Sequence, residues 1–126
     1  MSATAVRRYE VTARSTETFG RVHWTCRGQH FVADGPVYNG CPGEAITPAE
    51  LFLAGIAACG SELVEVVARA EGVPLRRVAV QVAGELDPQR PVRDDVTVFT
   101  SVRLSFELTG VGEEEAQRLV ERFTRR

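Results

Sequence analysis

The feature that most constrains this chain is the run from Leu51 to Gly60, in which no side chain is polar. An ordinary surface helix shows one apolar stripe, whereas a helix that is apolar all round has to be covered all round. A sheet packed on such a helix covers only one side of it. The fold must therefore provide a second cover for this segment.

The two ends of the segment carry explicit helix signals. Thr47 is a suitable N-cap, Pro48 suits the first helical position, and Glu50 completes a capping box with Thr47. At the other end Gly72 is a suitable C-terminal cap, and a proline follows two residues later. The pattern predicts one helix from Thr47 to about Glu71.

Small residues in this helix allow another backbone to approach closely. They are Ala54, Gly55, Ala57, Ala58 and Gly60. A glycine inside a helix costs about 1 kcal/mol relative to alanine, so close packing is the natural compensation. Because apolar surface of this extent is rarely left exposed on a monomer, we expect an intimate homodimer with this helix near its centre.

Alternation of apolar and polar residues predicts strands on both sides of the helix. Residues 5–33 have an extended pattern, and residues 34–46 form a loop rich in glycine and proline. After the helix, Arg77 to Glu85 and Asp95 to Leu108 alternate with a period of two, and a solvated hairpin loop separates them.

A last helix is predicted from Gly112 to the end of the chain. Its buried stripe consists of Ala116, Leu119, Val120 and Phe123. We therefore expect a single domain over residues 1–126 with an α+β fold. The element order is β-β-β-α-β-β-α, with a long central apolar helix and an intertwined homodimer.

Composition excludes several classes of partner. The formal net charge is -2 and the arginines are scattered, so we expect no nucleic-acid partner. The longest uninterrupted apolar run is half the roughly 20 residues that span a bilayer, so we expect no membrane partner. The N-terminus shows no basic region followed by an apolar core, which predicts a cytoplasmic protein.

Three cysteines lie in dissimilar surroundings, which argues against a disulfide framework. Cys26 alternates in phase with Val22 and Trp24, and we interpret it as a core residue. Cys41 lies in a glycine-rich loop as an exposed thiol that could resolve a sulfenic acid, although an incidental surface cysteine is the favoured interpretation. Cys59 lies in the apolar helix, where a lone cysteine is usually a small buried hydrophobe.

A metal site could in principle be assembled from His23, Cys26, His30 and Cys41. Its spacing matches no common zinc pattern, and His23 and Cys26 point to opposite faces of a strand. We therefore predict no metal site and no cofactor.

The string from Thr47 to Cys59, TPAELFLAGIAAC, resembles the OsmC/Ohr family. A glycine-rich loop precedes this string, and Glu71-Gly72-Val73-Pro74-Leu75 and a valine-rich strand follow the helix. The resemblance covers most of the chain, including the order of its elements. Its most specific part is the proline-acid-leucine start that leads to the Ala-Ala-Cys ending.

The resemblance implies an intertwined homodimer with two sites at the subunit interface. The better-known members reduce organic hydroperoxides with a helix cysteine, which Cys59 matches. A second cysteine resolves the sulfenic acid, and a dithiol such as a lipoyl group restores the enzyme. An arginine from the N-terminal strands and a glutamate at the helix start assist, which assigns Glu50 and either Arg21 or Arg14, with Arg21 the better match.

The sequence departs from that pattern in two ways. No cysteine follows Cys59, and the chain ends about where the family's second cysteine would come, so either the sequence is cut short or a resolving thiol is lacking. In the hydroperoxide reductases the assisting glutamate directly follows the proline. Here Ala49 has that position, and Glu50 comes one place later. This spacing is similar to the less characterised branch of the family.

Glu50 and Cys59 are also poorly placed to act together in one reaction. Nine residues at about 100° each put them on opposite faces of the helix, roughly 13 Å apart along its axis. The nearest same-face neighbour of Cys59 is the anion Glu62, so an activating arginine must come from elsewhere in the fold or from a partner subunit.

Two hypotheses follow. The leading one is a dimeric OsmC-like thiol peroxidase of the oxidative-stress class, which reduces small hydroperoxides through Cys59, Arg21 and Glu50 with a dithiol reductant. The competing one is a non-catalytic OsmC-like dimer that binds a small apolar ligand at its interface.

Overall fold

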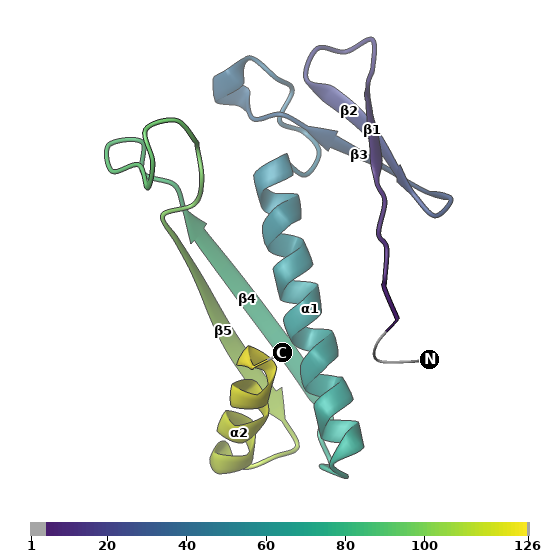
Figure 1. Cartoon of the computed structure of the whole chain (residues 1–126), viewed down its shortest axis with the longest axis vertical. Helices are drawn as coiled ribbons and strands as arrows, with labels where there is room; N and C mark the ends of the chain where they lie inside the picture. Colours follow the sequence, from purple (N-terminus) through teal and green to yellow (C-terminus); the bar gives the residue numbers. More distant parts are fainter. Residues whose placement is uncertain (1–4, 126) are drawn as a thin grey trace. The chain divides into compact units, whose positions relative to one another are not determined.

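The computed structural model describes residues 5–125. Two parts of the chain lie outside the described residues. They are Met1–Thr4, where the sequence shows no secretion signal, and Arg126, the last residue of the predicted final helix. The elements follow the order β1, β2, β3, α1, β4, β5, α2, with a short 3-10 turn, η1, before α1 (Figure 1). The chain forms two compact units, Met1–Leu51 and Phe52–Arg126, and each is described by itself. The expected single domain stays a prediction.

The first unit contains a three-stranded antiparallel sheet in the order β1-β2-β3. The strands are β1 (Thr12–Ser15), β2 (Arg21–Cys26) and β3 (Gln29–Asp34). A two-residue turn joins β2 to β3, and both of its residues have positive φ, 49° at Arg27 and 80° at Gly28. Such turns match the twist of a hairpin, which explains why the register of β2 against β3 is well defined.

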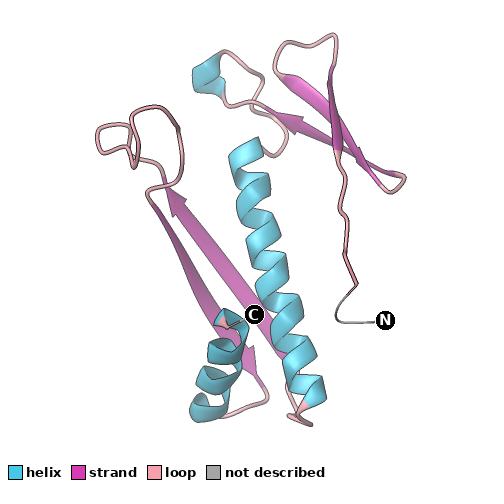
Figure 2. Cartoon of the chain, viewed as in Figure 1, coloured by secondary structure: helices cyan, strands magenta, loops and turns pink. Residues whose placement is uncertain are grey.

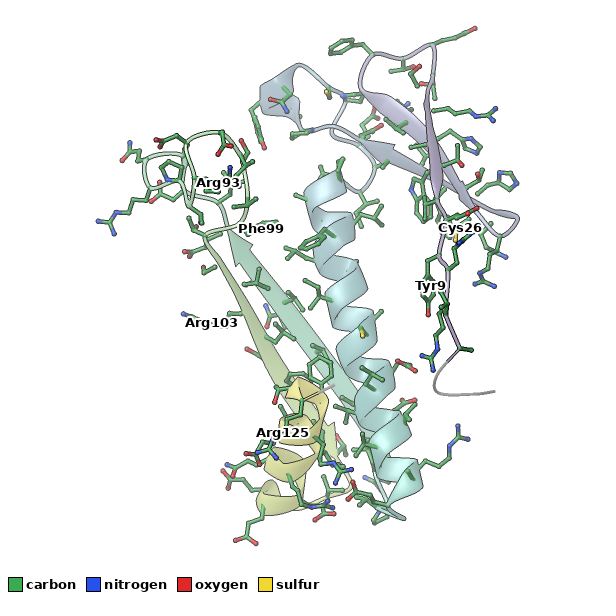
Figure 3. The ribbon with its side chains drawn as sticks, in the orientation of Figure 1. Tyr9, Cys26, Arg93, Phe99, Arg103 and Arg125 are labelled. Carbon is green, nitrogen blue, oxygen red and sulfur yellow. The ribbon has the colours of Figure 1, made fainter. Side chains whose placement is uncertain are left out.

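This register sorts the side chains of the sheet onto two faces. Trp24 lies opposite Phe31, and their rings stack with centroids 4.3 Å apart. The other face carries Arg21 opposite Asp34 and His23 opposite Val32. Cys26 pairs with Gln29 at the end of β2, beside the turn (Figure 3). Cys26 is half-buried there and is not one of the buried residues of the core, so the interpretation as a core residue was wrong.

The long helix α1 spans Pro48–Ala70, as the sequence predicts to within one residue at each end (Figure 2). Its start is the predicted capping box: the backbone N–H of Thr47 donates to Glu50 Oε1 at 2.9 Å, and the N–H of Glu50 donates to Thr47 Oγ1 at 3.3 Å. Gly72, with φ of 68°, allows the chain to leave the helix.

The second unit contains the hairpin of β4 (Arg77–Glu85) and β5 (Ser101–Thr109). Val80 lies opposite Phe106 and Val82 opposite Leu104 on the face that packs inward. Figure 3 shows Arg103 on the side of β5 away from α1. The predicted start of this strand at Asp95 was wrong, because β5 begins six residues later, at Ser101.

The helix α2 (Glu113–Thr124) completes this unit. The buried residues Val64, Val67 and Ala68 of α1 and Leu119 of α2 form one cluster, against which Phe106 and Phe123 pack. Arg118 of α2 pairs with Glu71, just beyond the end of α1, and with Glu115. Of the expected buried stripe of α2, Leu119 is fully buried, whereas Ala116, Val120 and Phe123 are half-buried.

The two interior glycines of α1 have different surroundings. A Cβ added at Gly60 would lie 3.4 Å from the Phe106 ring, so this glycine lets the hairpin approach the helix. A Cβ at Gly55 would meet nothing within 4 Å. The close approach predicted from the small residues therefore takes place within the chain at Gly60, whereas Gly55 lies on an uncovered side.

By length and composition alone, α1 would qualify as a membrane span. An 18-residue window of it has a mean hydropathy of 1.8, and only 22% of that window is buried within the chain. The core helix of a soluble protein meets the same criterion. The 18-residue window meets the criterion although the uninterrupted apolar run, Leu51 to Gly60, is shorter than a membrane span.

Candidate functional site

Arg21 forms the best-defined ion pair of the first unit. Its Nε donates to Asp34 Oδ1 at 2.8 Å and its Nη2 to Asp34 Oδ2 at 2.9 Å. Nη2 also donates to Glu44 Oε1 at 3.1 Å. This two-point contact fixes the plane of the guanidinium group. Nη1 donates no hydrogen bond within residues 5–125, so its N–H groups are available to another acceptor.

Asp34 is the fully buried partner in this pair, with no exposed surface. Its Oδ2 also accepts the backbone N–H groups of Glu44 at 3.0 Å and Ala45 at 2.9 Å. The hydrogen bond from Arg21, helped by those from Ala45 and Glu44, holds the pKa of Asp34 far below its usual value, although burial opposes this shift. The same contacts with Asp34 and Glu44 raise the pKa of Arg21. One carboxylate thus fastens both the arginine and the loop that leads to α1.

The second candidate arginine, Arg14, lies opposite His23 in the pairing of β1 with β2. It shares a face of the sheet with Arg21. Among the described residues, Arg14 has no ion pair comparable to the Arg21–Asp34 contact. The geometry therefore favours Arg21 as the arginine with a fixed orientation, and the assignment of a catalytic role to it stays a prediction.

Glu50 is occupied by the start of α1. Its Oε1 accepts both the backbone N–H of Thr47 at 2.9 Å and the Thr47 hydroxyl at 2.8 Å. These two hydrogen bonds lower the pKa of Glu50, the backbone one most. The structural interpretation of Glu50 as half of a capping box is confirmed, and its catalytic role stays a prediction.

Within a single chain, the Cys59 side chain is exposed. It lies in the second unit, and its neighbours along the uncovered side of α1 are the exposed residues Ala54, Gly55 and Ala58. One turn further on, this side becomes charged at Glu62. The thiol is thus accessible from an apolar surface of small side chains, rather than buried as an inert core residue.

Cys41 is half-buried, so the interpretation as an exposed loop thiol was wrong. A Cβ added at Gly20 would lie 2.4 Å from Cys41 Sγ, and one added at Gly35 would lie 2.5 Å from it. The thiol therefore fills a space that exists only because both neighbours are glycines.

Sequence reasoning missed Asp34 and Glu44 as partners of Arg21. A signal for Asp34 was present in the Arg27-Gly28 dipeptide. A two-residue hairpin turn at this position sets the register that brings Arg21 opposite Asp34. Glu44 comes from an irregular loop, and no pattern in the sequence indicates its contact. Within residues 5–125, no group of three or more histidine, cysteine or acidic side chains is arranged to hold a metal ion.

Comparison with known proteins identifies the family. The model of the OsmC-like protein family matches residues 41–126, which is more than half of the chain and includes α1 and Cys59. The chain belongs to the OsmC-like family. No curated protein sequence matches the chain.

Solved structures of OsmC-like proteins share the fold. An OsmC-like protein from Mycoplasma pneumoniae is 19% identical with a TM-score of 0.80, and the alignment covers 95% of this chain and 82% of that one. An organic hydroperoxide resistance protein, OsmC, from Legionella pneumophila is 24% identical with a TM-score of 0.76, covering 97% and 85%. The organic hydroperoxide resistance protein OhrB of Bacillus subtilis is 26% identical with a TM-score of 0.65, covering 96% and 86%.

These matches confirm the α+β fold and the OsmC/Ohr assignment. Several similar structures are named organic hydroperoxide resistance proteins, at identities that leave the specific activity of this chain open to experiment.

Proposed function

We propose that this OsmC-like protein is a thiol-dependent reductase of organic hydroperoxides, with Cys59 as the attacking thiol. The observation that carries the proposal is the position of Cys59: an exposed thiol on an apolar stretch of small residues, inside the segment that matches the family. An apolar peroxide is the substrate that such a surface would accept, because it gains from leaving water.

The chemistry requires a thiolate. Its sulfur attacks the terminal peroxide oxygen, an S–O bond forms as the O–O bond breaks, and the leaving alkoxide takes a proton to become an alcohol. Sulfur is oxidised to a sulfenic acid. Arg21 is proposed to supply the cation that favours the thiolate and orients the peroxide, with Asp34 fixing its guanidinium plane.

A dithiol is proposed to restore the enzyme directly. Its first thiol attacks the sulfenic sulfur and releases water, and its second displaces Cys59 and leaves as a disulfide. Cys41 is packed between Gly20 and Gly35, which favours an external reductant over this internal thiol. The protein is proposed to act as a homodimer, in which a second copy covers the apolar side of α1.

The test is a steady-state assay with cumene hydroperoxide and a dithiol such as dihydrolipoamide. Cys59→Ser is expected to reduce the rate to that of the uncatalysed reaction, whereas Cys26→Ser and Cys41→Ser keep it. Arg21→Lys is expected to lower the rate, because a lysine cannot reproduce the two-point contact with Asp34. An unchanged rate in Cys59→Ser, or no activity in the native protein, contradicts the proposal.

A second candidate function is a non-catalytic dimer that binds a small apolar ligand. Two observations favour it: within residues 5–125 the Glu50 carboxylate accepts both of its hydrogen bonds from Thr47, and the charge of Arg21 is shared by two carboxylates. If the native protein has no peroxidase activity, and a bound apolar ligand protects Cys59 from a thiol probe, this function replaces the first.

A further inference from the structure

Two histidines lie together on the first unit, on the face of the sheet that also carries Arg21. His23 is in β2 and His30 is in β3. The register places Val32 opposite His23 and Thr25 opposite His30, so the histidines are diagonal neighbours on one face. Neither residue has a part in the proposed peroxide chemistry.

The two rings point a nitrogen at each other. His23 Nε2 and His30 Nδ1 are 3.3 Å apart, whereas the ring centroids are 5.3 Å apart and the planes differ by 14°. Because the two nitrogens are closer to each other than the two centroids are, they lie on the facing edges of the rings. In the neutral pair, one ring donates its N–H and the other accepts it.

The same separation suits two ligands of one metal ion. With Zn–N bonds of about 2.0–2.1 Å and a tetrahedral angle, two ligating nitrogens stand about 3.3 Å apart. His30 is exposed and His23 half-buried, so rotation about the Cβ–Cγ bonds can aim both lone pairs at one point above the sheet. The donor ring then changes tautomer, and the metal takes the place of the shared proton.

We propose that His23 and His30 form a two-histidine site for a divalent transition-metal ion, with water as the remaining ligands. Imidazole favours Zn²⁺, Ni²⁺ and Cu²⁺, whereas Mg²⁺ and Ca²⁺ prefer oxygen ligands. All the residues involved belong to the first unit, so the proposal is independent of the function of Cys59.

The charges around the pair limit its affinity. Arg14 lies opposite His23 on the same face, and its positive charge repels a metal ion. Asp34 shares this face, but Arg21 already occupies its carboxylate. The remaining cross-strand neighbours, Thr12, Thr25 and Val32, are uncharged. Removal of the Arg14 charge is therefore expected to strengthen metal binding.

The experiment is titration of the tag-free native protein with Zn²⁺ alone by calorimetry. His23→Gln and His30→Gln are each expected to weaken binding by more than the roughly 10- to 100-fold that loss of an outer-shell partner costs. Arg14→Gln is expected to tighten it, and Cys59→Ser to leave it unchanged. Circular dichroism of each variant shows whether the fold is kept.

A second measurement uses Cu²⁺ alone and reads the ligands directly. Electron paramagnetic resonance of the one-to-one complex is expected to show coupling to two imidazole nitrogens, and to one in either histidine variant. Zn²⁺ binding that survives both histidine variants, binding that Cys59→Ser removes, or a Cu²⁺ spectrum without two nitrogens overturns the proposal. Peroxidase activity is not a readout here, so its loss leaves this site unaffected.

Discussion

At the scale of single residues, Asp34 has the most demanding position in the first unit. It is fully buried, and its carboxylate accepts two hydrogen bonds from Arg21 and two from backbone N–H groups. A buried carboxylate with these partners is favourable only while it is ionised, because protonation leaves donors without an acceptor. Arg21, in turn, depends on Asp34 for its orientation.

The first prediction concerns the pH dependence of stability. The folded state holds the pKa of Asp34 below its ordinary value, so its contribution is complete above that value, about 4, and is lost as the pH falls further below it. Asp34→Asn is therefore expected to lower the free energy of unfolding at pH 7 and to flatten its decline below about pH 4.

Urea unfolding at a series of pH values measures this effect. Glu44→Gln is the matched control, because Glu44 is 78% exposed and its pair with Arg21 is screened by water. The control is expected to keep nearly the native stability and its dependence on pH. Equal losses in the two variants at pH 7 would show that Asp34 is not the residue that fastens this loop.

Residue-level prediction from sequence succeeded where the signal was local. The Thr47–Glu50 capping box needs four consecutive residues and was predicted correctly. The Arg21–Asp34 pair spans thirteen positions and depends on a turn whose type decides the register. The packing of Cys41 depends on two glycines from different segments, so no local pattern could indicate it.

At the scale of elements, α1 and β4 matched the sequence prediction closely, whereas β5 did not. Val96 and Val98 continue the alternation of the strand, yet the ladder begins only at Ser101. The reason is tertiary: Phe99 turns inward, packs over Gly84 and stacks on Phe52 with centroids 5.9 Å apart. That contact takes the preceding residues out of the ladder, and the alternation alone cannot reveal it.

The second prediction concerns the start of α1. Thr47→Ala removes the side chain that accepts from Glu50 N and donates to Glu50 Oε1, and loss of an N-cap costs about 1 kcal/mol of stability. Chemical denaturation measures the change. Thr97→Ala, in an exposed part of the β4–β5 connection, is the control and is expected to change stability by less than about 0.5 kcal/mol. A Thr47→Ala variant as stable as this control would contradict the capping role.

At the scale of the whole molecule, the apolar composition of α1 exceeds what its own chain covers. One side of the helix packs on β4, β5 and α2 through Gly60, Val64 and Val67. The other side leaves Ala54 and Ala58 exposed and gives Gly55 open space. Apolar surface of this kind is the reason that the sequence predicts a homodimer, and the proposed function requires the same cover to exclude water from Cys59.

The last prediction tests this cover. Sedimentation equilibrium of the native chain at micromolar concentration is expected to give twice the monomer mass of 13.8 kDa. Ala58→Glu places a carboxylate on the uncovered side of α1, and burying it in a dimer without a partner is costly, so this variant is expected to be monomeric. Because Ala58 is exposed within its own chain, the variant is expected to keep the native circular dichroism spectrum. Ser105→Glu, on the outer face of β5, is the control and is expected to remain a dimer. A monomeric native protein, or an Ala58→Glu variant that stays dimeric, would mean that something other than a second copy covers this side of α1.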